Sequence, residues 1–126
     1  MEKTVIVGLI HRNQNQKKLS EYLDELEFLS FTAGGVVEKR FTQRIENPNP
    51  ATLIGKGKMN EILTYIKVNK IKTIIFDDEL SPAQEKNISK TLNIKVLDRT
   101  NIELTGVGYK LYPVNPLINN KYKFNN

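Results

Sequence analysis

The sequence predicts an α/β domain in which a small parallel sheet of about four strands is flanked by helices. Short apolar runs alternate with amphipathic segments through nearly the first hundred residues. Because strand–crossover–strand connections are right-handed, this alternation gives parallel strands with helices on the faces of the sheet. The length of 126 residues suits one domain with its own core. We place that domain in residues 1–101 and an irregular or disordered tail in residues 102–126, where glycine, proline and asparagine break every regular pattern.

Four segments have the composition of strands. The runs at 4–9, 73–76 and 94–97 are short and rich in valine, isoleucine or leucine, which is typical of strands buried in a parallel sheet. We expect 73–76 to be central because it is apolar without alternation. The segment 36–44 alternates less cleanly, so we place it nearer an edge of the sheet.

Three segments have the apolar periodicity of helices. The first spans about residues 19–33 and stops at the glycines that follow. A second, over 57–69, carries apolar residues on one face. The third begins at Ser81 and runs to about Leu92, because Ser81, Pro82 and Gln84 provide an N-cap, a first-turn proline and a capping-box glutamine.

The composition indicates the cellular compartment and the class of binding partner. The chain has no cysteine, which excludes a disulfide framework and favours a reducing compartment, so we expect it in the cytoplasm. The apolar run at 5–10 is too short to span a membrane, and we find no export signal. A net charge of +5 favours a polyanionic partner but does not by itself establish one.

The sequence Gly55-Lys56-Gly57-Lys58 is the most suggestive local motif. Free backbone amides and the helix dipole attract anions at a helix start, and two lysines add positive charge there. The Walker spacing is missing, because Lys58 is followed by Met59 and not by serine or threonine. Three interpretations remain open: a tight turn into a helix, contacts with RNA phosphates, and nucleotide binding.

Five cations are candidates for contact with an RNA backbone, because guanidinium and ammonium groups near loops can neutralise phosphates. They are Arg40, Arg44, Lys56, Lys58 and Arg99. For each of them a solvated surface charge is the competing interpretation. The sequence contains no RNA-recognition motif with stacking aromatic residues, so we expect shape and charge to govern any binding.

Carboxylates follow two of the predicted strands. Asp77 and Asp78 come after 73–76, and Asp98 ends the next strand, so they are expected at the carboxyl edge of the sheet, where α/β proteins bind ligands. One interpretation is a small-ligand or nucleotide-binding domain. Its carboxylates could then hold magnesium, which prefers oxygen ligands. The other is that these groups cap helices and pair with Arg99 or with a lysine. His11 is the only histidine, so we predict neither a resident metal nor catalytic residues.

Several short blocks occur together in a recognisable order. They are Thr32-Ala33-Gly34, Thr42-Gln43-Arg44, the segment 48–58 (PNPATLIGKGK), the segment 76–84 with Asn87, and the segment 96–101. In this order and at this spacing, residues 25–101 resemble the N-terminal domain of the HflX family of ribosome-associated GTPases.

The resemblance implies a parallel α/β unit that is followed in the family by a helical hairpin and a GTPase domain. The family binds the large ribosomal subunit, hydrolyses GTP, and splits or rescues ribosomes. The resemblance therefore implies a non-catalytic module that contacts ribosomal RNA, with no expectation of DNA or membrane binding. GTP and Mg²⁺ would belong to the GTPase domain, so no cofactor is expected here.

The chain departs from the family pattern after residue 101. Residues 102–108 lead into a segment rich in proline and asparagine, and we expect neither the hairpin nor the GTPase domain. A natural short paralogue, a truncated gene product and a deliberate fragment all remain open as origins. A separately encoded GTPase domain is then a candidate partner, and a non-functional remnant of a GTPase is a further alternative.

Overall fold

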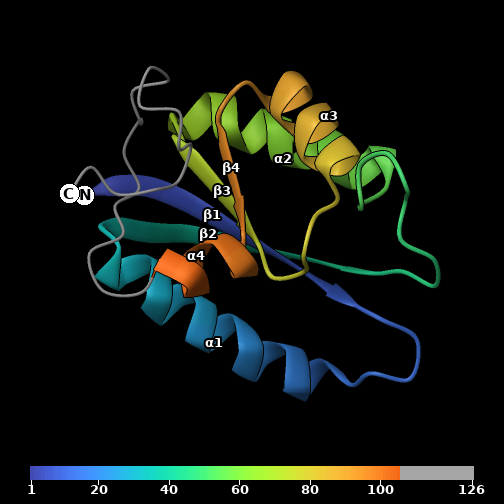
Figure 1. The fold of residues 1–126 in the computed structure, drawn as a ribbon. Coiled ribbons are helices and arrows are strands. Elements are labelled where there is room, and N and C mark those ends of the chain that lie inside the picture. Colours follow the sequence, from blue (N-terminus) through green and yellow to red (C-terminus); the bar gives the residue numbers. More distant parts are fainter. Residues whose placement is uncertain (106–126) are drawn as a thin grey trace.

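The computed structural model describes residues 1–105 and contains a single parallel sheet with helices on both faces (Figure 1). The strands lie in the order β2-β1-β3-β4. Along the chain the elements are β1 (Glu2–Ile10), α1 (Gln16–Thr32), β2 (Gly35–Arg44), α2 (Lys56–Asn69), β3 (Thr73–Phe76), α3 (Pro82–Leu92), β4 (Lys95–Asp98) and α4 (Arg99–Thr105). The predicted fold class is therefore confirmed. The central place of residues 73–76 and the edge position of the second strand are confirmed as well.

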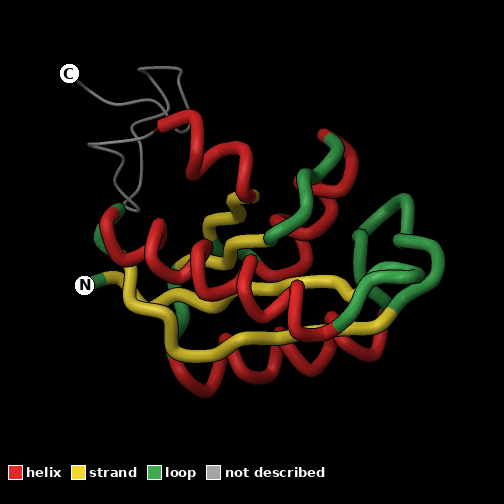
Figure 2. Tube along the Cα trace, turned by 90° about the horizontal axis from the view of Figure 1, so that it is seen from below, coloured by secondary structure: helices red, strands yellow, loops and turns green. Residues whose placement is uncertain are grey.

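Two helical layers enclose the sheet because side chains alternate along its strands. On β1, Val5, Val7 and Leu9 point to the face covered by α2 and α3. Ile6 and Ile10 point to the opposite face, where they pack with residues of α1 and α4. Figure 2 shows the strands between these helical layers. One strand thus contributes to both halves of the core.

The C-terminal boundary differs from the prediction. Helix α4 runs from Arg99 to Thr105, across the boundary expected at residue 101. Ile102 is 3% exposed and packs with the core residues beneath α1, so its burial holds the helix against the sheet. The irregular or disordered tail predicted for 102–126 therefore cannot begin at 102, and its remainder, 106–126, lies outside the described residues.

Local chemistry sets the helix starts. Ser81 forms the predicted capping box with Gln84. Its hydroxyl accepts from the Gln84 backbone amide at 3.1 Å, and its own backbone amide donates to the Gln84 side-chain oxygen Oε1 at 2.9 Å. Helix α1 begins three residues earlier than its apolar stripe indicates, at Gln16. Asn15 caps it by accepting a hydrogen bond from the Lys18 amide at 2.7 Å. Its first turn is exposed and polar, so periodicity could not mark it.

Edge strand β2 is protected from pairing with other chains. Its register with β1 slips by one residue, so that Thr4 faces Val37 and Val5 faces Lys39. The extra residue, Glu38, forms a bulge, and the charged side chains of Glu38, Lys39 and Arg40 follow one another along the strand. A bulge and consecutive charges discourage edge-to-edge association of sheets.

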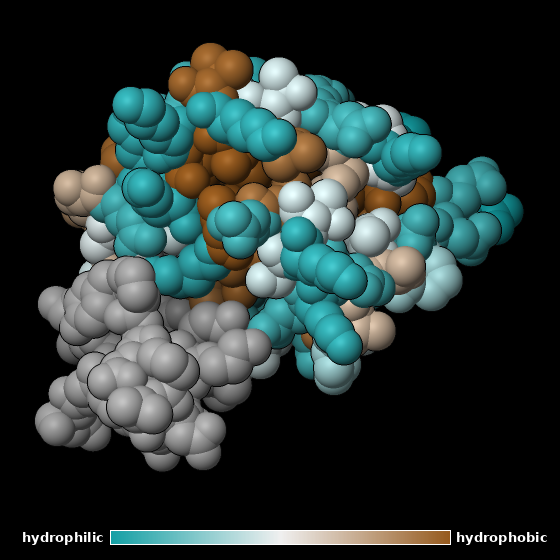
Figure 3. Space-filling view, turned by 90° about the horizontal axis from the view of Figure 1, so that it is seen from above, coloured by the Kyte–Doolittle hydropathy of each residue, from teal (hydrophilic) through white to brown (hydrophobic). Residues whose placement is uncertain are grey.

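On the face over α2 and α3, apolar surface shows between hydrophilic side chains (Figure 3). Part of it lines a groove between α3 and β4, where Leu80, Pro82 and Ile94 lie with Lys86 and Lys90. Among residues 1–105, none of the helices is sufficiently long and apolar to cross a membrane.

The contact of α1 with the sheet yields a stability prediction. A Cβ at Gly8 would lie 2.9 Å from a Leu19 methyl carbon and 3.1 Å from one of Leu23, so in Gly8→Ala these buried leucine side chains must shift. We expect it to lower the free energy of unfolding by about 1–3 kcal/mol, measured by urea denaturation.

Gly57→Ala is the matched control, because nothing lies within 4 Å of its added Cβ and the position is helical. It should raise stability by up to about 1 kcal/mol through helix propensity. Equal effects of the two substitutions would contradict the close approach of α1 to β1.

Candidate functional site

Most of the predicted site residues lie at one edge of the sheet. Because all four strands are parallel, their carboxyl ends share that edge, and the helices that follow them begin there. Arg44 and Asp98 end β2 and β4 at this edge, and Asp77 and Asp78 follow β3. The first turns of α2 and α4 contain Lys56, Lys58 and Arg99. Arg40 is the exception, since it lies within β2 opposite Ile6 of β1.

Asp98 is a structural cap. It is 5% exposed, and its two carboxylate oxygens accept hydrogen bonds from the backbone amides of Leu80 at 2.8 Å and Asn101 at 2.9 Å. The Asn101 side chain in turn accepts from the Asp98 amide at 3.0 Å. Asp98 thereby joins the end of β4 to the start of α4 and to the loop before α3.

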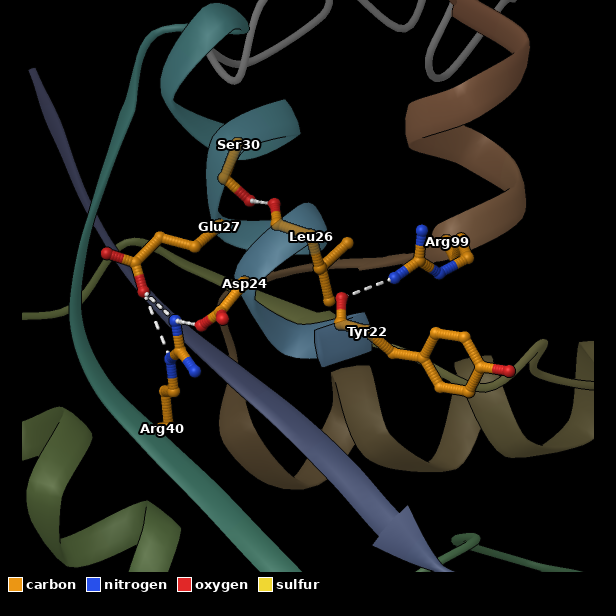
Figure 4. Close-up of polar contacts among 7 residues, drawn as sticks. All are labelled: Tyr22, Asp24, Leu26, Glu27, Ser30, Arg40 and Arg99. Atoms are coloured by element: carbon orange, nitrogen blue, oxygen red, sulfur yellow. Dashed lines mark hydrogen bonds and ion pairs between the residues drawn. The ribbon is translucent and has the colours of Figure 1, made fainter. Parts of the chain in front are cut away.

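Arg99 ties three segments together. It donates to Asp77 from Nε at 2.8 Å and to Glu25 at 2.7 Å. It also donates to the Tyr22 backbone carbonyl oxygen at 2.7 Å, as Figure 4 shows. Burial raises the pKa of the Asp77 carboxyl, and the hydrogen bond and charge of Arg99 only partly oppose this shift. Arg99 thus attaches α1 to the ends of β3 and β4.

The remaining aspartate, Asp78, lies with its carboxylate oxygen 2.6 Å from His11 Nε2, and this contact links the loops after β3 and β1. Each of Asp77, Asp78 and Asp98 therefore has an intramolecular partner. In the described part of the chain no three acidic, histidine or cysteine side chains converge as a metal site would require. A ligand-binding role for these aspartates stays a prediction, and the observed contacts favour the structural interpretation.

Arg40 is also held by carboxylates. It donates to Asp24 at 2.7 Å and to Glu27 at 2.9 Å, both on α1 (Figure 4). Burial alone would lower the pKa of Arg40, but the hydrogen bonds and charges of Asp24 and Glu27 together outweigh it and raise the pKa. Arg40 thus fastens β2 to α1, and its charge is largely balanced by these two groups.

The other three cations are in a different setting. Arg44 and Lys56 are exposed and form no ion pair within the described residues, whereas Lys58 pairs with Glu61 at 3.0 Å along the helix. Helix α2 begins after Gly55 with no side-chain cap and no acidic residue in its first turn. Lysines at the positive end of a helix dipole are unfavourable unless an anion accompanies them. The start of α2 is therefore the part of this edge best suited to a phosphate.

The turn between β2 and α2, residues 45–55, positions this helix start. The Gly55 amide donates to the side-chain oxygen of Gln43 at 3.0 Å. Leu53 has a positive φ of 68° although its side chain is buried, a conformation that costs a residue with a Cβ about 1–2 kcal/mol. These contacts were not predicted from the sequence. Asn49, between the prolines, was the available signal, because asparagine favours local turn hydrogen bonds.

The fold and these contacts define a small parallel α/β domain with exposed cations where its second helix begins. A family model described as "GTP-binding GTPase N-terminal" matches residues 20–105. The chain belongs to the HflX family, to whose N-terminal domain it corresponds. The resemblance noted from the motif blocks is therefore confirmed.

The similar proteins are all much longer than this chain. A "GTPase HflX" of Flavobacterium psychrophilum is 60% identical over 103 residues, which cover 82% of this chain and 25% of that protein. A "GTPase HflX" of Escherichia coli is 35% identical over 96 residues, 76% of this chain and 22% of that protein. The chain thus spans about a quarter of the length of these relatives.

A solved structure titled "crystal structure of SsGBP and GDP complex" has the same fold, with a TM-score of 0.63 and 22% sequence identity. The match covers 82% of this chain and 28% of that one. At this identity the likeness extends to the fold alone.

The structural role of Asp98 can be tested by comparing two aspartates. Asp98→Ala leaves two backbone amides without their acceptor and should lower the free energy of unfolding by about 2–4 kcal/mol. Asp78→Ala removes only the contact with the partly exposed His11 and should cost less than about 1 kcal/mol. Urea denaturation of both variants measures the difference, and a larger loss for Asp78→Ala would contradict the assignment.

The raised pKa of Asp77 predicts that the stability of the domain depends on pH. Its pKa is raised above the usual 3.8, so between 3.8 and the raised value the folded protein holds a proton that the unfolded chain has lost. The contribution of Asp77 to stability is therefore largest at low pH and falls as the pH rises through this window. The difference in unfolding free energy between the parent and Asp77→Asn should decrease from about pH 3 to about pH 7. An increase over that range would mean that Arg99 outweighs burial.

Proposed function

We propose that this chain is a docking module that binds the ribosomal RNA of the large ribosomal subunit and catalyses no reaction itself. The chain is a member of the HflX family. This membership supports the ribosome as the target, because the resemblance of the motif blocks implies a family of ribosome-associated GTPases. Hydrolysis of GTP in the longer relatives would then belong to the part of their length that this chain does not span.

The start of α2 is the observation that carries the proposal. Lys56 and Lys58 lie where the helix dipole is positive, and the first turn contains no acid. Lys56 is exposed without an ion pair in the described residues, whereas Lys58 pairs with Glu61 of the next turn at 3.0 Å. A bound phosphate would accept hydrogen bonds from the first free amides of the helix and neutralise the lysines at the same time. Arg44, exposed at the end of β2, precedes the same turn and adds a third cation.

The five sequence-predicted cations therefore separate into two groups. Arg40 and Arg99 each bind two carboxylates within the domain, so they have little charge to offer a polyanion. We retain Arg44, Lys56 and Lys58 as the RNA-binding residues. Phosphate contacts of this kind position a protein on RNA without reading its sequence, so recognition would follow shape and charge.

Co-sedimentation of the purified chain with large ribosomal subunits across a salt series tests the proposal. We expect saturable binding that weakens steeply with salt, because each phosphate contact releases counterions. Lys56→Ala/Lys58→Ala should weaken binding and lower the slope of log K against log salt by about two.

A matched control removes two lysines at the opposite end of the domain. Lys67 lies in the last turn of α2, and Lys72 is an exposed residue just before β3. Lys67→Ala/Lys72→Ala changes the net charge by the same amount as Lys56→Ala/Lys58→Ala. If binding depends on the start of α2 and not on net charge, this control should leave the slope of log K against log salt within about one of the parent value. Equal losses for both double variants, or no binding by the parent at low salt, would contradict the proposed docking site.

A further inference from the structure

The turn of residues 45–55 contains several hydrogen bonds between its own residues. Asn49 and Leu53 exchange two backbone hydrogen bonds, at 3.0 and 2.8 Å. The Asn49 side-chain oxygen also accepts from the amides of Ala51 at 2.7 Å and Thr52 at 3.2 Å. These contacts fold the turn back on itself in front of α2.

Two side chains of α3 hold the same turn from outside. Gln84 donates to the Asn49 carbonyl oxygen at 2.8 Å, and Asn87, one helical turn further along, donates to the Ala51 carbonyl oxygen at 3.0 Å. Gln84 is also part of the α3 capping box, so its removal would disturb the start of that helix. Within the described residues, Asn87 forms no other side-chain hydrogen bond, and its bond to the turn is exposed.

The strain at Leu53 indicates why these contacts matter. A leucine with positive φ persists only where the surroundings over-determine the backbone, and such positions cluster at binding sites. The segment 47–51, which the α3 side chains hold, is largely exposed and has two prolines that restrict it further. The turn is thus a rigid, protruding surface beside the cations at the start of α2.

We propose that Asn87 is a positioning residue that holds this turn in the shape that contacts RNA. The proposal rests on the proposed function and adds a second, uncharged element to it. Exposed backbone groups, the Asn47 carboxamide and the proline rings can contact sugar hydroxyls, phosphate oxygens and base faces without releasing counterions. Loosening the turn should therefore weaken binding at every salt concentration without changing the slope.

The test compares two substitutions in the same helix. Asn87→Ala removes the contact with the turn, and Ser89→Ala removes an exposed polar group of α3 that has no side-chain bond to the turn in the described residues. The free energy of unfolding of both variants in urea should lie within about 0.5 kcal/mol of the parent value, as is usual for surface substitutions. Binding to large ribosomal subunits is measured for each across the salt series.

Asn87→Ala should bind about fivefold more weakly than the parent at each salt concentration, with the parent slope, whereas Ser89→Ala should match the parent. Affinity equal to that of Ser89→Ala would overturn the proposal. A slope lowered as in Lys56→Ala/Lys58→Ala would also overturn it, because Asn87 would then act through the cations.

Amide hydrogen exchange of Ala51 and Leu53 separates this proposal from the proposed function. Both amides are bonded within the turn, so we expect them to exchange about fivefold faster in Asn87→Ala than in the parent, with or without RNA. Unchanged exchange would refute the positioning role even if the chain binds ribosomes. A parent chain that fails to bind would instead refute the proposed function and the recognition role of the turn together.

Discussion

The described fold depends on β1, because this one strand pairs with both β2 and β3 and buries side chains on both faces of the sheet. A shift of its register by one residue would exchange the side chains offered to the two helical layers. Gly8 adds a second constraint, since its missing Cβ lets α1 approach the strand closely. Since β1 is parallel to both neighbours, the loops that follow the strands gather at one edge, and the position of the candidate site follows from that pairing.

The charged residues of the described domain fall into two kinds. Asp98 is buried with both of its oxygens hydrogen-bonded to backbone amides, and Arg99 and Arg40 each join two carboxylates to a helix or a strand end. Buried and half-buried charges are tolerated in folded proteins when they are paired in this way. Their main effect is to fix loops and helix starts relative to the sheet. Arg44 and Lys56, by contrast, are exposed and form no ion pair within the described residues, and Lys58 pairs only with Glu61 of its own helix.

A rigid turn next to exposed cations suits recognition by shape. Residues 45–55 are held by hydrogen bonds from within, from β2 and from α3, so little conformational freedom remains to be lost on binding. The mobile part of such an interface is then the ends of the lysine and arginine side chains. Cations attract a phosphate backbone at a distance, whereas a preformed turn restricts which RNA surfaces can be approached closely.

The sequence by itself determined the fold class, the four strands to within two residues at each end, the central place of β3 and the capping box at Ser81. These features depend on residues that are close along the chain, so apolar periodicity and capping patterns report them directly. The motif blocks were also sufficient for the family. Only the tertiary structure decided that α4 continues to Thr105, that Arg40 and Arg99 are bound to carboxylates, and that Asn87 reaches the turn before α2. The partners of these residues lie 13, 22 and 36 positions away, and a charge or an amide in a sequence does not indicate which distant group the parallel sheet will place beside it.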